Sequence, residues 1–111
     1  MIISLSYTRS FEAQFKRFKK KYASLESDFK IFINNINLEK SVDLGGGLHK
    51  YRLLVKSKNK GKSGGFRVVS FEALIAEHHK KFTLLDIYDK SEKSNVSKKE
   101  MIEILQNEGI I

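Results

Sequence analysis

The spacing of the large hydrophobic residues changes along the chain, and this change limits the possible folds more than any other feature. Near the N-terminus, four aromatic residues follow one another at steps of four, three and four: Phe11, Phe15, Phe18 and Tyr22. That spacing predicts one buried stripe along an α-helix. From Leu48 onward, hydrophobic and polar residues alternate instead, which is typical of β-strands. The sequence therefore predicts an α+β protein.

A second amphipathic helix is predicted directly after the first. It opens at Ser24, ends near Asn37 and buries five residues of one face: Leu25, Phe29, Phe32, Ile33 and Ile36. Because the connection between the two helices is short, we expect an antiparallel helical hairpin. The glycine-rich residues 43–47 are predicted to form a loop.

The remaining elements complete the predicted fold. Four segments show the pattern of strands: residues 2–7, 48–56, 66–75 and 82–88. Connections between the last three strands are too short for crossover helices, so we expect these strands to pair antiparallel. Ser97 and Glu100 form a capping box that predicts a final helix. The predicted order is β-α-α-β-β-β-α, with the hairpin on one face of an antiparallel sheet and the opposite face exposed.

Length and composition limit the class of protein further. A chain of 111 residues fits a single domain, residues 1–111. It contains no cysteine, and its three histidines lack metal-ligand spacing, so we expect neither disulfides nor a zinc site. No apolar segment approaches the ~20 residues of a membrane helix, and the N-terminus lacks the pattern of a signal peptide. We expect a soluble, cytoplasmic protein that does not enter a membrane.

The positive charges are segregated along the chain, whose net charge is +8. Residues 44–71 contain seven basic residues and no acidic one, and residues 9–22 contain six basic residues against Glu12. Such segregation favours a surface that binds nucleic acid or an acidic protein. The alternative is that the lysine-rich surface only keeps the protein soluble and binds no partner.

Three strings of residues carry family motifs: HKYRL at 49–53, GKSGGFRVV at 61–69 and LLDIYDKSE at 84–92. They resemble the RelE superfamily of toxins, and within it the HigB-like branch, whose members carry a similar GKSGG-x-R loop and Y-D-K-S-E segment. With the order of elements, the resemblance covers nearly the whole chain. It implies a small RelE-like domain with a curved antiparallel sheet packed against two N-terminal helices.

The resemblance also implies an activity and partners. Members of the family cleave mRNA in the ribosomal A site and are silenced by a cognate antitoxin. The toxin is then expected as a monomer or as a hetero-oligomer with its antitoxin. RNA can be cut without a metal or other cofactor when its own 2′-hydroxyl attacks the phosphorus and cations stabilise the added charge.

Site residues are assigned by the same resemblance. Lys50 matches the first basic residue of the family's strand and is a candidate base or phosphate ligand. Arg52 matches the second, and Arg67 matches the arginine that would clamp the scissile phosphate bidentately. Lys90 is a further candidate cation of the catalytic site. Candidate RNA-binding residues are Lys56, Lys62 and Lys93.

The general acid is not assigned by this pattern. Where the best-studied members have an arginine and a tyrosine, this chain has Ser91 and Ser97, and Ser97 is better explained as a helix cap. Tyr88 is a nearby phenol, but its alternation with Leu84 fits a core position equally well. His49 is a candidate because histidine titrates near neutral pH.

Two other functions fit the same sequence. A ParE-like toxin would share the fold but poison DNA gyrase, and it would not need Lys50, Arg52 and Arg67 around one phosphate. A non-catalytic nucleic-acid-binding module would also use the basic segments. However, the sequence lacks the exposed aromatic residues of a base-stacking platform.

Overall fold

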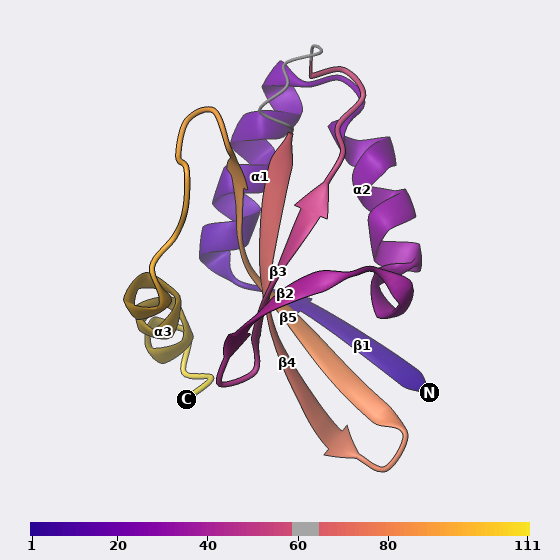
Figure 1. The fold of residues 1–111 in the computed structure, drawn as a ribbon, viewed down its shortest axis with the longest axis vertical. Coiled ribbons are helices and arrows are strands. Elements are labelled where there is room, and N and C mark those ends of the chain that lie inside the picture. The colour runs from indigo at the N-terminus through magenta and orange to yellow at the C-terminus, as the bar shows by residue number, and fades with distance from the viewer. Residues whose placement is uncertain (59–64) are drawn as a thin grey trace.

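The chain forms a sheet with a pair of helices on one face and helix α3 on the other (Figure 1). The structure is a computed structural model that describes residues 1–58 and 65–111. The elements in chain order are β1 (Ile2–Tyr7), α1 (Arg9–Lys21), α2 (Leu25–Asn34), the 3-10 helix η1 (Ile36–Leu38), β2 (Ser41–Gly45), β3 (Leu48–Leu53), β4 (Phe66–Ala76), β5 (His79–Asp89) and α3 (Lys98–Asn107). The α+β class, the helical hairpin and the C-terminal helix are confirmed.

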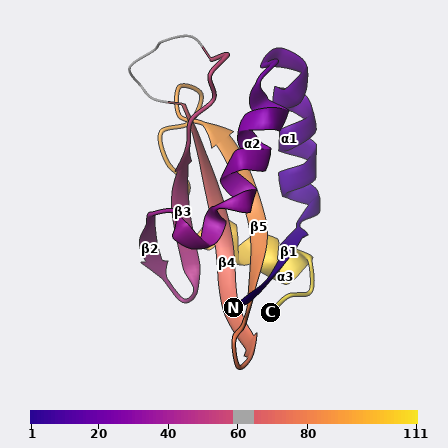
Figure 2. The ribbon, with the colours of Figure 1, turned by 90° about the vertical axis from the view of Figure 1, so that its right-hand side faces the viewer.

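Within the described residues, five strands form one sheet in the order β1-β5-β4-β3-β2. Strands β3, β4 and β5 pair antiparallel, as predicted. Strand β1 differs, because it pairs with β5 in parallel, with Leu5 opposite Phe82. Strands β3 and β5 run in the direction of β1, whereas β2 and β4 run in the opposite direction (Figure 2). The sheet is therefore mixed rather than wholly antiparallel.

The glycine-rich segment contains a strand that the sequence did not predict. Strand β2 pairs antiparallel with β3, and the chain turns between them at Gly46 and Gly47, which have φ values of 63° and 86°. A Cβ atom on Gly47 would lie 3.0 Å from the Phe71 ring, so a larger residue does not fit there. The expected loop is thus a tight hairpin, and its glycines obscure the strand pattern.

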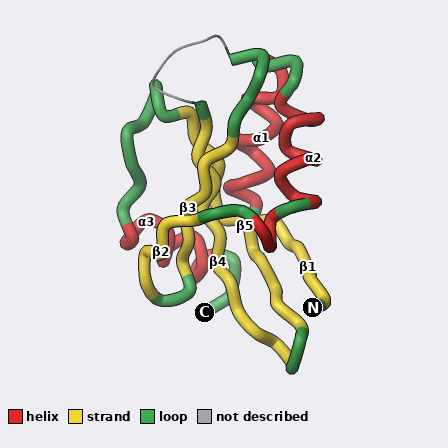
Figure 3. The backbone as a smooth tube through the Cα atoms, turned by 45° about the vertical axis from the view of Figure 1, so that its right-hand side comes forward, coloured by secondary structure: helices red, strands yellow, loops and turns green. Residues whose placement is uncertain are grey.

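Two hydrophobic clusters pack against opposite faces of the sheet. The larger cluster lies under α1 and α2 and includes Phe18, Phe66 and Phe82. The second cluster lies under α3, where Met101 and Leu105 pack with residues of β3, β4 and β5. Figure 3 shows α3 on the side of the sheet away from the helical hairpin. The expectation that this second face is open was therefore wrong over the part that α3 covers.

A β-bulge in β5 decides which residues face α3. Val69 pairs with Asp86, but the next residue of β4, Ser70, pairs with Leu84, so Leu85 is an extra residue in β5. Leu84 consequently packs in the cluster under the hairpin, whereas Leu85 and Tyr88 pack in the cluster under α3. Simple alternation from Leu84 would have placed Tyr88 on the hairpin side, and the bulge reverses that.

Side chains cap the starts of two helices, and the cap of α3 is the predicted one. The Thr8 hydroxyl accepts a hydrogen bond of 3.0 Å from the backbone N–H of Phe11 at the start of α1. Ser97 and Glu100 form both hydrogen bonds of the capping box at the start of α3. Among the helices of the described residues, none is long and apolar enough to span a membrane.

Candidate functional site

Three polar side chains form a row across the middle of the sheet, on the face that α3 partly covers. Arg52 of β3 pairs with Arg67 of β4, and Arg67 pairs with Tyr88 of β5. Paired residues on neighbouring strands point to the same face with their Cβ atoms about 5 Å apart. Arg52 is exposed, whereas Arg67 is 7% exposed and donates a hydrogen bond of 3.1 Å to the carbonyl of Phe66.

The two arginines influence each other electrostatically. Burial and then the neighbouring charge of Arg52 lower the pKa of Arg67 below its usual value. A pair of like charges held side by side in this way does not stabilise the fold by itself. Guanidinium groups bind phosphate through paired hydrogen bonds, so this row is a candidate anion-binding site.

A second row lies next to the first along the same face. Lys50 of β3 pairs with Val69, which pairs with Asp86. The Lys50 Nζ donates a hydrogen bond of 3.2 Å to Asn95 Oδ1, in the segment that leads into α3. Burial raises the pKa of Asp86, and the positive charge of Lys93 partly opposes that rise. A buried carboxyl group thus lies beside the cations.

The Tyr88 hydroxyl is enclosed and has no hydrogen-bond partner among the residues that the structure describes. Leaving a buried hydroxyl without a partner costs about 1–3 kcal/mol, so such a group calls for an explanation. Burial raises the pKa of Tyr88, while Arg67 lowers it and Asp86 adds to the rise. The phenol therefore keeps its proton at neutral pH. The Nζ of Lys93 lies 5.9 Å from the centre of its ring.

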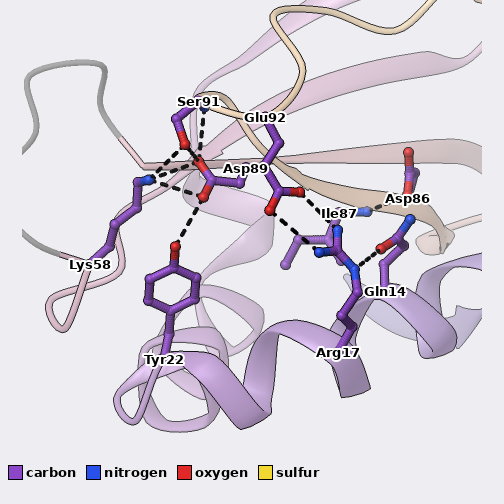
Figure 4. A network of polar contacts seen from close by, with 9 residues as sticks. All are labelled: Gln14, Arg17, Tyr22, Lys58, Asp86, Ile87, Asp89, Ser91 and Glu92. Atoms are coloured by element: carbon purple, nitrogen blue, oxygen red, sulfur yellow. Dashed lines mark hydrogen bonds and ion pairs between the residues drawn. The ribbon is translucent and has the colours of Figure 1, made fainter.

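The residue after Tyr88 lies in a network on the opposite face (Figure 4). Asp89, which is 1% exposed, accepts hydrogen bonds from Tyr22 at 3.2 Å, from Lys58 at 3.0 Å and from the hydroxyl of Ser91 at 2.8 Å. Burial alone would raise the pKa of Asp89, but the contacts with Lys58 and Ser91 outweigh it and lower this pKa below its usual value. Asp89 is thus an ionised anchor for the end of β5.

A second contact of this segment reaches helix α1. Arg17 forms an ion pair of 2.9 Å with Glu92 and donates a hydrogen bond of 2.9 Å to Gln14 (Figure 4). The guanidinium also lies 4.0 Å from the centre of the Phe18 ring. Together with Asp89, this pair fixes the turn that leads from Tyr88 to Lys93.

The structure brings together four of the residues that the sequence singled out. Lys50, Arg52 and Arg67 share one face of the sheet, and Lys93 lies over Tyr88 on that face. Lys56 borders a shallow hollow next to Arg52 at the end of β3. We refer to these five residues as the basic surface.

The three other predicted residues are not part of this group in the structure. Lys90 is exposed in the turn after β5, where its backbone N–H donates to the carbonyl of Gly65 at 3.1 Å. Lys62 lies outside the described residues. His49 points away from the basic surface, because its ring contacts Ser41 at 3.1 Å and lies 3.9 Å from Glu72.

Sequence reasoning missed two features of this region. It left Tyr88 open between site and core, and it did not consider Asp86, because the bulge that turns both toward α3 leaves no simple periodic signal. The consecutive residues Leu84 and Leu85 gave no hint of it, because ordinary alternation along a strand also buries neighbouring residues on opposite faces when both faces are covered. Lys58 was counted with the basic surface, but its side chain is 12% exposed and is paired with Asp89.

The fold and this group of cations define a small basic α+β protein with a candidate anion-binding site on its sheet. The family model for the RelE toxin of the RelE / RelB toxin-antitoxin system matches residues 8–108. The chain therefore belongs to the RelE toxin family, which confirms the resemblance seen in the sequence. A toxin of such a system has a cognate antitoxin as its partner.

Proposed function

We propose that this toxin is an endoribonuclease that inhibits translation by cutting mRNA on the ribosome without a metal ion. The observation that carries the proposal is the row of Arg52, Arg67 and Tyr88, with Lys50 beside it. Family membership supports the same conclusion, since RelE toxins are generally ribosome-dependent mRNA endonucleases.

The chemistry needs three contributions from the protein. The 2′-hydroxyl attacks the adjacent phosphorus, the bond from phosphorus to the 5′-oxygen breaks, and a 2′,3′-cyclic phosphate and a free 5′-hydroxyl result. A base takes the proton from the 2′-hydroxyl, an acid gives one to the departing 5′-oxygen, and cations stabilise the negative charge that accumulates on the phosphorane.

We assign charge stabilisation to the basic side chains. Arg67 offers two parallel N–H groups to the phosphate, and Arg52 and Lys50 add positive charge from β3. Lys93 and the exposed Lys56 would hold the RNA on either side. Lys90 and Lys62 stay candidate cations from their positions in the sequence.

The proton transfers are assigned to the two buried groups. Tyr88 keeps its proton at neutral pH and is the proposed donor to the departing oxygen, which supplies the partner that its hydroxyl lacks. Asp86 has a raised pKa, which makes it a stronger proton acceptor than an ordinary aspartate. Lys93 lies near both groups, since its Nζ is 5.9 Å from the centre of the Tyr88 ring and its charge opposes the rise in the pKa of Asp86.

A cell-free translation reaction tests the proposal. Purified toxin is added to a defined mRNA, and primer extension maps the new 5′ ends. We expect cuts within translated codons, none in the same mRNA without ribosomes, and no cut where the 2′-hydroxyl is replaced by hydrogen. Cleavage is expected to persist when a chelator removes other metal ions and free Mg²⁺ is kept high enough for the ribosomes to stay assembled.

The same assay separates the two alternative functions. A toxin that stops growth but leaves mRNA intact and inhibits gyrase supercoiling would be ParE-like. A protein that binds RNA without producing new 5′ ends would be a non-catalytic module. Either result would overturn the proposed activity.

A further inference from the structure

The hollow next to Arg52 adjoins the candidate site at the end of β3. Its volume is about 270 Å³, and its lining comes from helix α2, the end of β3 and the residues that follow that strand. Strand β2 pairs with β3 only as far as Tyr51, and the part of β3 that lines the hollow begins at the next residue. The hollow therefore lies where the described part of the sheet loses its outermost strand.

The apolar wall of this hollow is exposed. Leu54 is 71% exposed and Ile31 is 57% exposed, and both line the hollow together with the buried Phe32. A single exposed hydrophobic residue needs no explanation. Here, however, two of them from distant parts of the sequence border one hollow beside cations. Such a surface offers apolar contact to a ligand whose charged part binds those cations.

Hydrogen bonds hold the walls of the hollow together. Asp28 of α2 is 7% exposed and accepts hydrogen bonds of 2.8 Å from the backbone N–H of Lys56 and of 2.7 Å from the hydroxyl of Ser24. The Ser24 hydroxyl in turn accepts a hydrogen bond of 2.8 Å from the backbone N–H of Ser57. The start of α2 is thus joined to the residues after β3. A hollow formed before the ligand arrives lowers the cost of binding.

The cations beside the hollow continue the candidate site. Arg52, Leu54 and Lys56 are exposed, whereas the residues between them are buried, so these three side chains point outward together. Arg52 pairs with Arg67 in the row across the sheet. An RNA strand whose phosphates contact both Arg52 and Lys56 would therefore pass over Leu54.

These features fit a nucleobase better than a further phosphate. The carboxyl groups of Asp28 and Glu39 line the same hollow and would repel a phosphate, but a carboxylate accepts hydrogen bonds from the N–H groups of a base. The faces of an unpaired base are apolar, and the plane of an arginine such as Arg52 stacks on them. The volume is below the about 300–1,000 Å³ of pockets for drug-sized ligands, which suits a single base.

We propose that this hollow binds one unpaired base of the mRNA, in a nucleotide that flanks the scissile phosphate. The proposal rests on the proposed function, because it takes that phosphate to lie at Arg52 and Arg67. Leu54 and Ile31 contact the faces of the base, and Glu39 accepts a hydrogen bond from its edge. The hollow thereby contributes to the choice of sequence that the toxin cuts.

A double-mutant cycle between protein and RNA tests the base subsite. Leu54→Gln removes an apolar wall at an exposed position. Leu38→Gln is the matched control, at a residue that is 80% exposed and does not line the hollow. The substrates are ribosome-bound mRNAs in which the base on one or the other side of a mapped cleavage site is removed, while the ribose and its 2′-hydroxyl stay. Single-turnover cleavage is measured for every combination.

We expect removal of one of the two bases to slow the wild type and the Leu38→Gln variant about tenfold. Leu54→Gln should slow cleavage of the intact mRNA by a similar factor. Removing the base should then slow this variant by less than about twofold more, because both changes remove the same contact. Ile31→Gln should repeat the result from the other wall and replaces Leu54→Gln if thermal melting shows that the latter is unfolded.

The proposed function and the base subsite fail in different ways. A wild type that cuts no mRNA on ribosomes would overturn both. A wild type that cuts mRNA but is not slowed by base removal would overturn the subsite alone. So would base removal that slows Leu54→Gln and Ile31→Gln as much as it slows Leu38→Gln. Unchanged cleavage by both variants, together with weaker antitoxin binding or loss of a dimer, would make the hollow a protein interface instead.

Discussion

Tyr88 and Asp89 are consecutive residues of β5, yet their surroundings differ in every respect. Asp89 lies under the helical side with hydrogen bonds from Tyr22, Lys58 and Ser91. Tyr88 lies under the α3 side, where its hydroxyl has no partner among the described residues. The first environment compensates the buried charge with three hydrogen bonds, and the second leaves a buried hydroxyl without a partner among the described residues.

Under the proposed function, one strand serves both stability and catalysis. Buried polar groups that are fully paired hold a segment in one position, whereas groups without partners are retained where a ligand completes them. The Asp89 network fixes the end of β5, and the neighbouring Tyr88 thereby keeps its position beside Arg67. We therefore expect substitutions on the two faces to affect different measurements.

Arg67→Gln should cause the largest change in activity. Removing the charge that we assign to the scissile phosphate is expected to lower the cleavage rate about 100–1,000-fold. The fold should tolerate the change, because glutamine removes the repulsion from Arg52. Single-turnover cleavage on ribosomes and thermal melting measure the two effects. Arg9→Gln, at an exposed arginine of α1, is the control; full activity in a folded Arg67→Gln protein would contradict the mechanism.

Asp89→Asn should lower the stability of the fold rather than the cleavage rate. It leaves the buried end of Lys58 without its anion, so unfolding should become easier by about 2–4 kcal/mol. The contacts lower the pKa of Asp89, so its contribution is complete above the usual aspartate pKa of about 4 and is lost as the pH falls below it. Denaturation in urea at several pH values should show the two proteins converging in acid. A difference in unfolding free energy that grows as the pH falls would contradict the stabilising role of ionised Asp89.

Tyrosine-to-phenylalanine changes on the two faces sharpen the comparison. Tyr88→Phe removes a hydroxyl without a partner, so stability should stay within about 0.5 kcal/mol or rise, while cleavage falls about 10–100-fold. Tyr22→Phe removes a hydrogen bond to Asp89, so stability should fall by about 1 kcal/mol while the rate changes little. Equal effects on the rate would mean that the Tyr88 hydroxyl has no chemical role.

Arg17→Ala should have the smallest effect. The ion pair with Glu92 joins the same segment to α1, but both side chains are substantially exposed. An exposed pair contributes less than about 1 kcal/mol and is screened by salt. A loss above 2 kcal/mol in urea denaturation would show that this contact, rather than Asp89, fixes the turn.

Much of the fold could be predicted because its signals are local. The stripe of Phe11, Phe15 and Phe18 requires a helix, and the capping box of Ser97 and Glu100 marks the start of the last one. Lys50 and Arg52 stand two residues apart on a strand, so period two places them on one face without further information. These predictions needed no knowledge of distant contacts.

The remaining features depend on partners far away in the sequence. The bulge at Leu85 appears only when β5 is paired with β4, and it alone decides that Tyr88 faces α3. Lys58 looks like any surface lysine until Asp89 lies next to it. Strand β2 is hidden by glycines that the tight turn requires.

The parallel pairing of β1 with β5 has a consequence for synthesis of the chain. The first strand to be made finds its neighbour only after residues 79–89 have been made, so the sheet is completed late and through contacts of long sequence separation. A nascent chain that stops before β5 lacks both the strand that pairs with its N-terminal strand and the proposed proton donor Tyr88. If the proposed function holds, most of the chain must be synthesised before the toxin becomes active.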